Sequence, residues 1–369
     1  MIGHGKDRQR VRDLPCHGKQ VVIEVYHQRF LCKSCHKTCF APLPGGEDGH
    51  AMTMRLVRYI ERKALSTKRT FASIAEEIGI DPGTVRRICL DYIAQLDQTT
   101  QFETPAILGI DELHVLHQAR GIMTNVEART IVELLPDRKK ATIIQCLRQM
   151  KHPERIATVV IDCWRPYREA VRAVVPDATI VCDKFHILKL ATTALEQFRK
   201  EISSSLSDGQ RRTLKMHDRY LLLRRVHDLS SEDRFVLESW TKNYPPLGQA
   251  HQLKENFFAI YDHSTRELAE NAYFRWMESV PKELLHVYQP LMLTVEEWGD
   301  AIFAHFETGI TGGFVESANN IARFLNRLGR GYGMDVLRGR LLYGWEPAQT
   351  SCVGQSRKGV PIPTLVSSR

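Results

Sequence analysis

Alternation of apolar and polar residues is the main feature of the N-terminal segment. Residues 19–31 alternate with the period of two that is typical of a β-hairpin, and they lead directly into Cys32-Lys-Ser-Cys35. Residues 41–49 are rich in Pro and Gly, a composition typical of a linker. We therefore expect a small Cys-containing β segment over residues 1–45.

Helical spacing of apolar residues follows the linker. It covers residues 54–65 and the short amphipathic segment 71–78, and it resumes over residues 83–93 after the break Gly79-Ile-Asp-Pro82. A helix, a tight turn containing Gly and a second helix make up the helix-turn-helix pattern. The pattern predicts a helix-turn-helix DNA-binding domain over residues 50–97, although a small helical bundle with a solvated basic face has the same spacing.

The middle of the chain alternates strands with helices, and the last third is helical. The predicted strands are 106–116, 121–128, 130–135, 156–162 and 178–183, and the predicted helices are 141–150, 166–174 and one beginning near Phe185. Helical spacing then covers residues 190–305, a Gly-rich loop covers 307–313, a further helix covers 314–327, and the polar tail 346–369 is expected to be flexible. Strands separated by helix-length segments indicate an α/β fold with a partly parallel sheet.

The charge balance and the Cys content narrow the class of protein. The 369 residues carry a formal net charge of +8, which favours a polyanionic partner such as nucleic acid, although a protein that is simply basic has the same balance. No apolar run approaches the roughly 18 residues of a membrane span, and the charged N-terminus lacks the apolar core of a secretory signal. Four of the nine Cys lie within the first forty residues, so we expect reduced thiols in the cytoplasm rather than a disulfide framework.

Three Asp residues directly follow apolar runs of predicted strands, namely Asp111, Asp162 and Asp183. Each alone could cap a following helix. An Asp at such a position disfavours the strand and places a charge beside the core, so three comparable positions indicate a bound cation. Carboxylate oxygens suit Mg²⁺, and two such ions can activate an attacking oxygen and stabilise a leaving oxygen at one phosphorus.

A fourth acidic candidate, Glu316, lies near the start of the predicted helix 314–327. Asn320 and Arg323 follow it at helical spacing, so the three side chains share one face of that helix. A carboxylate followed by Asn and Arg on one face suits metal binding beside a phosphate backbone. On spacing alone, a surface helix with an acid favoured by the helix dipole fits equally well.

At this point the chain resembles the DDE transposases of bacterial insertion sequences, in particular the ISL3 family. The motifs that carry the resemblance are Gly109-Ile-Asp-Glu112, Ile161-Asp162 followed by Tyr167, Asp183-Lys-Phe-His186, and Val315-Glu-Ser-Ala-Asn-Asn320 followed by Arg327, Gly329, Gly331 and Tyr332. Each motif is short, and their order and spacing make the set specific. The resemblance covers the chain from about residue 10 to about residue 345.

The resemblance implies an RNase H-like catalytic core over residues 105–345, a mixed sheet flanked by helices, with a helical insertion at about residues 190–305. It implies that the catalytic and metal-binding triad is Asp111, Asp162 and Glu316, which would hold two Mg²⁺ or Mn²⁺ ions. The accessory residues expected near the site are Asp183, His186 and Asn320. For His186, an ordinary histidine at a helix start is an equally good interpretation.

The implied reaction is cleavage of a DNA strand at the end of the element, followed by attack of the freed 3′-hydroxyl on target DNA. Neither a covalent enzyme intermediate nor ATP is needed, because positioning and charge carry such phosphoryl transfers. The expected partners are the terminal inverted repeats and target DNA, with no membrane contact. Two-ended synapsis implies at least a homodimer in the active complex, associated with the bacterial nucleoid.

Polar and basic side chains are assigned to DNA contact. Those expected in or beside the helix-turn-helix are Lys63, Lys68, Arg69, Thr84, Arg86 and Arg87, and those expected near the active site are Arg323, Arg327 and Arg330. Arg338 and Arg340 extend the late basic cluster, which either follows DNA or is a solvated face.

The N-terminal Cys pattern departs from the family, which usually has two Cys-x-x-Cys pairs in a zinc site. Only Cys32 and Cys35 form such a pair here, and the hairpin matches the segment located between the two pairs in the family, so we expect the chain to begin after the first pair. Either the site is broken, or tetrahedral Zn²⁺ coordination is completed from among Cys16, Cys39, His17 and His4.

Two other classes of function fit part of the sequence. The first is an inactive or truncated DNA-binding protein derived from a transposase, which the partial zinc site favours. The second is an RNase H-like nuclease or resolvase, which the late Glu316 helix and the long helical insertion disfavour through the family resemblance.

Overall fold

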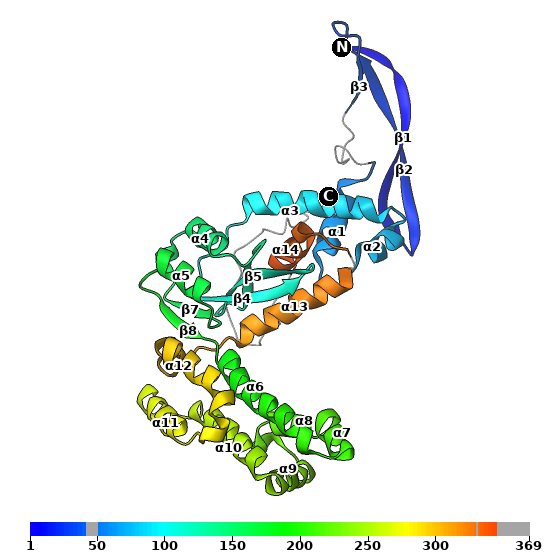
Figure 1. Cartoon of the computed structure of the whole chain (residues 1–369). Helices are drawn as coiled ribbons and strands as arrows, with labels where there is room; N and C mark the ends of the chain where they lie inside the picture. The colour runs from blue at the N-terminus through cyan, green and yellow to red at the C-terminus, as the bar shows by residue number, and fades with distance from the viewer. Residues whose placement is uncertain (42–50, 330, 345–369) are drawn as a thin grey trace.

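The computed structural model describes residues 1–41, 51–329 and 331–344. Figure 1 shows a long projecting hairpin, a central body that contains a sheet, and a lobe built of helices. The predicted tail 346–369 and Arg330 lie outside the described residues. Among the residues described, no helix combines the length and apolarity needed to cross a membrane.

The hairpin consists of β1 (Ile2–Cys16) and β2 (Lys19–Leu31), paired antiparallel, with the short β3 (Thr38–Phe40) added beside β2. We call the β1–β2 pair the ribbon. Its turn end is fixed to the body, because buried Asp13 accepts hydrogen bonds from Thr53 and Arg55. Beyond that anchor the ribbon extends away from the body (Figure 1).

The helix-turn-helix consists of α1 (Met54–Leu65), α2 (Phe71–Ile78) and α3 (Pro82–Thr99). A capping box between Thr70 and Ser73 starts α2, and Gly79 ends it with a left-handed φ of 76°, a conformation that favours glycine. The Asp81 side chain caps α3. The predicted helix-turn-helix is therefore confirmed, with each helix break explained by a local capping residue.

The central sheet has the order β6-β5-β4-β7-β8. Its strands are β4 (Ile107–Val115), β5 (Gln118–Asn125), β6 (Thr130–Leu134), β7 (Thr158–Ile161) and β8 (Thr179–Cys182). Strands β4, β7 and β8 are parallel, while β5 and β6 are antiparallel to their neighbours. This is the mixed sheet that the sequence predicted, and it forms the core of an α/β fold.

Helices cover both faces of the sheet because successive strand residues point to opposite sides. On one face, Leu108 and Ile110 pack with α4 (Lys140–Gln149) and α5 (Arg165–Val174). On the other face, the strands pack with α13 (Gly313–Gly329) and α14 (Met334–Tyr343). The predicted fold class is therefore confirmed.

A helical insertion separates β8 from α13 and forms the lower lobe of Figure 1. Its helices are α6 (Lys184–Ile202), α7 (Asp208–Met216), α8 (Arg219–Leu223), α9 (Ser231–Asn243), α10 (Pro245–Ile260), α11 (Arg266–Glu278) and α12 (Lys282–Thr308). The long α12 packs on α6 and on β8, and it ends at Gly309 with a left-handed φ of 66°. The insertion thus leaves the sheet at β8 and returns the chain to it at α13.

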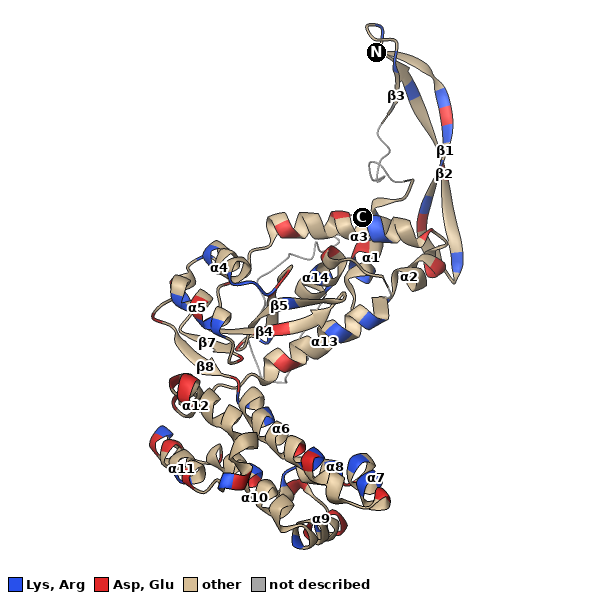
Figure 2. Cartoon of the chain, viewed as in Figure 1, with Lys and Arg blue, Asp and Glu red and all other residues tan. Residues whose placement is uncertain are grey.

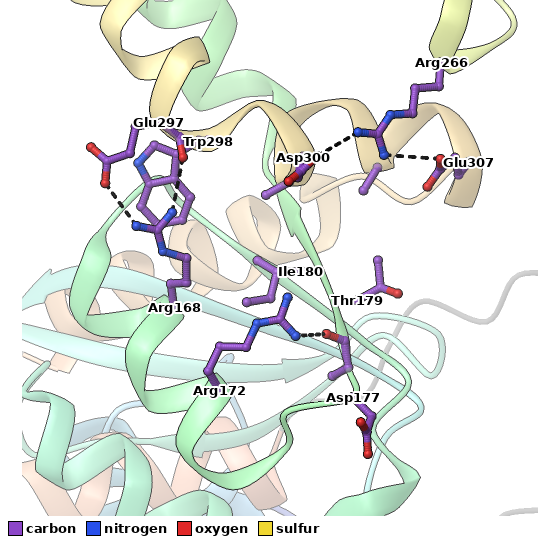
Figure 3. Close-up of a pocket in the computed structure, with 13 residues that line it drawn as sticks. Arg168, Arg172, Asp177, Thr179, Ile180, Arg266, Glu297, Trp298, Asp300 and Glu307 are labelled. Atoms are coloured by element: carbon purple, nitrogen blue, oxygen red, sulfur yellow. Dashed lines mark hydrogen bonds and ion pairs between the residues drawn. The ribbon is translucent and has the colours of Figure 1, made fainter.

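Arginine contacts fix the insertion to the edge of the sheet around a pocket of about 400 Å³ (Figure 3). The Arg168 guanidinium on α5 lies 4.0 Å from the Trp298 ring centroid and 3.1 Å from Glu297 Oε1, both on α12. Within the insertion, Arg266 on α11 donates to Asp300 and Glu307 on α12 and so joins these two helices. The Arg168 contacts hold α12 against α5 beside the sheet.

Candidate active site

The sheet register brings the three Asp residues into one row. Ile110 of β4 pairs with Ile161 of β7, which pairs in turn with Cys182 of β8. The residue after each of these is Asp111, Asp162 or Asp183, on three adjacent parallel strands or at their ends. The sequence pattern of an Asp after each apolar run therefore becomes a spatial row of carboxylates, bordering the carboxyl edge of the parallel strands.

Two of these carboxylates gather with an imidazole. Ligand atoms of Asp111, Asp162 and His186 all lie within 4.8 Å of one another. Within the described ranges this is the one group of three or more His, Cys, Asp or Glu side chains spaced for a metal ion. The same residues line a cavity of about 10 Å³, which is space for roughly one water-sized sphere.

The electrostatics of this group favour a bound cation. Burial raises the pKa of Asp111 to about 6, and burial together with the nearby Asp111 charge raises the pKa of Asp162 to about 6. The Asp162 Oδ1 atom is buried and has no hydrogen-bond partner within the described part of the chain. An unpartnered buried carboxylate oxygen is costly, so the donor set fits a hard divalent cation that takes oxygen ligands.

Asp183 has a different role from the other two Asp residues. Its side chain caps α6 by accepting from the Phe185 amide at 3.2 Å, and its Oδ2 lies 3.3 Å from His186 Nδ1. The contact with Asp183 is the largest cause of a raised pKa at His186. Helix capping, one of the two interpretations open for the Asp residues, thus holds for Asp183, which also orients the imidazole.

The start of α13 and the residue that precedes it lie against the carboxylate row about one turn to either side of Glu316. A Cβ atom on Gly312, which directly precedes α13, would lie 2.4 Å from Asp183 Cγ, so glycine suits this close approach. Asn319, which is buried, donates from Nδ2 to Asp111 Oδ2 at 2.6 Å. Glu316 occupies the same side of the helix by spacing, its side chain is exposed, and it is not part of the group formed with His186.

The amide that contacts the carboxylates is Asn319, whereas the sequence pattern pointed to Asn320. The structure shows Asn320 exposed, with its Oδ1 accepting from Arg323 Nη1 at 3.2 Å. By spacing, Asn319 lies three residues after Glu316 and could share its side of the helix. The burial of Val315 and Ala318, which selects Asn319 over Asn320, is not visible in the sequence.

Sequence reasoning also missed Arg138, in the turn before α4. Its guanidinium lies 4.8 Å from the Trp164 ring centroid and pairs with Glu112. Its charge is among the influences that lower the pKa of Asp162. A cation is therefore present beside the carboxylates.

The expected DNA-contacting residues of the helix-turn-helix separate into two groups. At the start of α3, Arg86 and Arg87 are exposed and Thr84 is half-buried, while the Val85 between them is buried in the helical core. Lys68 is also exposed, and Lys63 lies over the Tyr59 ring.

Arg69 instead makes contacts within the helix-turn-helix. Its guanidinium donates to Ser73 and Glu77 of α2. Near the active site, Arg323 is half-buried and its charge acts on Asp111, and Arg327 is exposed one turn further along α13.

The late basic cluster is not a DNA-facing surface at Arg338 and Arg340, so that alternative is wrong for these two residues. Arg338 forms ion pairs with Glu133 and Asp97. Arg340 is fully buried, with its guanidinium over the Phe71 and Tyr332 rings. Both arginines join α14 to neighbouring elements, Arg340 from a fully buried position and Arg338 from a partly exposed one.

The N-terminal Cys residues do not gather into one site. Cys32 and Cys35 are neighbours, and a hydrogen bond from the Cys35 backbone lowers the pKa of Cys32. Cys39 lies near the same end of the ribbon, opposite Phe30. Cys16 lies at the turn end, opposite Lys19, roughly 40 Å away by strand length, so the inclusion of Cys16 in that zinc site is wrong for this conformation.

A helix-turn-helix joined to an RNase H-like sheet is the architecture of enzymes that cut and transfer DNA. A family model described as transposase matches residues 108–341. A second, the helix-turn-helix domain of transposase family ISL3, matches residues 41–93, and a third, the zinc-finger of transposase IS204/IS1001/IS1096/IS1165, matches residues 1–35. The chain belongs to the ISL3 family of transposases, and its function is DNA transposition through DNA binding and cleavage.

Individual relatives agree with this assignment. The chain is 22% identical over 335 residues to the transposase for insertion sequence element IS1001 of Bordetella parapertussis, covering 89% of this chain and 82% of that protein. It is 23% identical over 274 residues to the transposase for insertion sequence element IS1557 of Mycobacterium tuberculosis, covering 67% of this chain and 61% of that protein.

Proposed function

We propose that this transposase uses Asp111, Asp162 and Glu316 to bind two divalent ions, Mg²⁺ or Mn²⁺, and so cleaves and joins DNA strands at the ends of an insertion sequence. The observation that carries the proposal is the row of carboxylates on adjacent parallel strands, with one buried Asp162 oxygen left unpartnered within the described part of the chain. The relatives described as insertion-sequence transposases support the choice of substrate.

Some side chains of the site would bind the metal ions, and others orient those side chains. Asp111 and Asp162 present oxygens from the sheet, and Asn319 fixes the Asp111 carboxylate through its 2.6 Å hydrogen bond. Glu316 presents a third carboxylate from α13, and Asp183 holds the His186 ring. When bound, divalent ions would activate the attacking oxygen and stabilise the leaving oxygen.

Basic side chains around the site suit the DNA backbone. Arg138, Arg323 and Arg327 lie beside or beyond the carboxylates and would neutralise phosphates on either side of the cleaved bond. At the other end of the body, the exposed Arg86 and Arg87 of α3 would contact the terminal repeats together with Thr84.

The domain division follows from this assignment of roles. We assign residues 1–45 to a zinc-finger-like segment, 50–97 to terminal-repeat binding and 105–345 to catalysis. Zinc, where it binds, would use Cys32, Cys35 and Cys39, with His4 as the nearest of the proposed imidazoles by strand position. Because both ends of the element must be cut together, the active complex would contain at least two copies of the chain.

The sharpest test concerns Glu316, because this residue stands outside the compact group of Asp111, Asp162 and His186. Glu316→Gln protein would be incubated with Mg²⁺ or Mn²⁺ and DNA that carries the terminal repeats. We expect specific DNA binding to remain and strand cleavage to be lost. Ser317→Ala is the matched control, because Ser317 is the exposed neighbour on the same turn and bonds only to the Gly313 carbonyl within the described residues.

The outcomes separate the competing functions. Normal cleavage by Glu316→Gln would remove Glu316 from the triad. Specific binding of the terminal repeats by wild-type protein with no cleavage would indicate a DNA-binding protein derived from a transposase. Cleavage of branched or RNA-containing substrates with no preference for the repeats would indicate a nuclease or resolvase.

A further inference from the structure

The ribbon and its short flanking segment, residues 1–41, together carry most of the excess positive charge of the chain. Residues 1–41 contain eight Lys or Arg and three Asp or Glu, whereas the whole chain has a net charge of +8. Figure 2 shows the basic residues recurring along β1 as it extends from the body. A charge so concentrated on a projecting element indicates a polyanionic partner for that element.

The β1 cations lie on one face. Lys6, Arg8, Arg10 and Arg12 occupy alternate positions, and alternate strand residues point to the same side. The register places Tyr26 of β2 directly opposite Arg8, so that tyrosine shares their face. We call this set the basic face. Successive cations on it are about 7 Å apart, close to the axial rise of two phosphates along one DNA strand.

The basic face is accessible. All four cations are exposed, and Tyr26 is 68% exposed. Glu24 pairs with both Arg8 and Arg10 and offsets one of the four charges. Near the body the opposite face of β1 is covered, because Val11 and Asp13 are buried there, whereas the basic face stays exposed from Lys6 to Arg12.

The basic face leads to the turn of the helix-turn-helix. Arg12 donates to the Gly79 carbonyl, in the turn between α2 and α3. Gln20 lies so close that a Cβ atom on Gly79 would be 1.8 Å from its Nε2 atom. The cations of β1 are therefore continuous with the segment that precedes the exposed Arg86 and Arg87 of α3.

We propose that the basic face binds duplex DNA directly beside the segment contacted by α3, so that ribbon and helix-turn-helix form one composite DNA-binding surface. A two-stranded β-ribbon fits the major groove of B-form DNA, and the spacing of the cations suits phosphate contacts. The proposal rests on the proposed function for its choice of DNA as the polyanion. It assigns a role to the ribbon that does not depend on bound zinc.

The test compares two charge-matched triple variants of the full-length protein. Lys6→Gln/Arg8→Gln/Arg10→Gln removes three cations from the basic face, and Lys200→Gln/Arg212→Gln/Lys215→Gln removes three exposed cations from the helical insertion. Binding to a duplex of arbitrary sequence is measured over a range of KCl concentrations. We expect the slope of log affinity against log salt to fall by about 2–3 for the ribbon variant, at about 0.9 per lost phosphate contact, and to stay unchanged for the insertion variant.

A third variant separates groove contact from charge. Tyr26→Ser keeps the net charge, so we expect weaker binding with an unchanged salt slope. An unchanged slope in the ribbon variant, or equal losses in both triple variants, would overturn the proposal.

Strand cleavage distinguishes this proposal from the proposed function. If the ribbon variant loses salt slope as expected but wild-type protein does not cleave the terminal repeats in Mg²⁺, the composite surface stands and the proposed function fails. If wild-type protein cleaves and the ribbon variant keeps its full salt slope, the proposed function stands and the composite surface fails.

Discussion

Two clusters of charged side chains in this molecule each contain three residues from different parts of the fold. The charges balance in one cluster and not in the other. Asp97 of α3, Glu133 of β6 and Arg338 of α14 form a closed network, in which the guanidinium donates to both carboxylates at 2.6–2.8 Å. Asp111, Asp162 and His186 place two carboxylates side by side and leave one of their buried oxygens unpartnered within the described part of the chain.

The difference lies in the balance of charges, and it separates a structural role from a chemical one. In the Arg338 network, opposite charges satisfy one another and join helix α14 to the sheet and to α3. In the Asp111–Asp162 group, burial of the carboxylates, together with repulsion from neighbouring carboxylates, raises both pKa values to about 6. A protein tolerates such a group where a ligand completes it.

The largest expected effect is on catalysis, through Asp162→Asn. We expect strand cleavage to fall by at least about 1,000-fold, because a bound metal supplies several kcal/mol and each 1.4 kcal/mol is tenfold in rate. The thermal midpoint should stay the same or rise, because the change removes repulsion within the group. Quantitative cleavage assays and calorimetry measure the two effects. Cleavage within tenfold of wild type would show that Asp162 does not take part in the reaction.

The Arg338 network should show the reverse behaviour. Arg338→Met leaves Asp97 and Glu133 without their cation, so we expect the free energy of unfolding to fall by about 2–3 kcal/mol, less than for a fully buried pair because Arg338 is partly exposed. Cleavage per folded molecule should be little changed. Chemical denaturation measures the loss, with exposed Arg58→Met as the control. Equal stability of the two variants would mean that the network is not structural.

The sheet part of the active site was predictable from the sequence because its signals are local. An apolar run that ends in an Asp is visible in the sequence for Asp111 and Asp162, and parallel pairing then aligns the two residues without further information. The helix-turn-helix was predictable for the same reason, since the break at Gly79 and the cap at Asp81 lie in one short segment.

The remaining features depend on contacts between distant parts of the chain. Arg338 seemed free in the sequence because its partner Glu133 lies 205 residues away. The choice of Asn319 over Asn320 depends on the rotation of α13 about its axis, which the packing of Val315 and Ala318 decides. Cys16 and Cys32 are close in the sequence, but residues 19–31 form one strand paired with residues 2–16 and not a hairpin of their own, so the two thiols lie at opposite ends of the ribbon.

Asn319 provides the next test, with its neighbour as a matched control. We expect Asn319→Ala to lower the cleavage rate by about 10–100-fold, the usual loss when a group that orients a metal ligand is removed. Asn320→Ala should change the rate by less than about threefold, since Asn320 contacts only Arg323 among the described residues and surface substitutions are usually near neutral. Comparable losses of cleavage rate in both variants would contradict the inference that Asn319, and not Asn320, orients Asp111.

The smallest effect, and the most direct comparison of the two clusters, is stabilisation by metal. At ten times its dissociation constant, Mn²⁺ should stabilise the folded protein by roughly 1.4 kcal/mol, or about 2 °C in thermal midpoint for a chain of 369 residues. The stabilisation should be absent in Asp162→Asn and kept in Arg338→Met, because Asp97 and Glu133 are not part of the group spaced for a metal ion. The stabilisation of wild-type protein by Mn²⁺ should also weaken below about pH 6, because protons then compete with the ion for Asp111 and Asp162.

The direction of this pH dependence comes from the raised pKa values of Asp111 and Asp162. Between about pH 4 and pH 6 the folded, metal-free protein binds more protons at these two residues than the unfolded chain does, so their contribution to stability falls as the pH rises. A bound cation offsets that loss only where the carboxylates are ionised. Differential scanning fluorimetry across this pH range, with and without Mn²⁺, measures both the pH dependence of the metal-free stability and the stabilisation by Mn²⁺. If the Mn²⁺-induced rise in thermal midpoint persists in Asp162→Asn, or disappears in Arg338→Met, the ion does not bind at the Asp111–Asp162 group. The proposed difference between the two clusters would then be wrong.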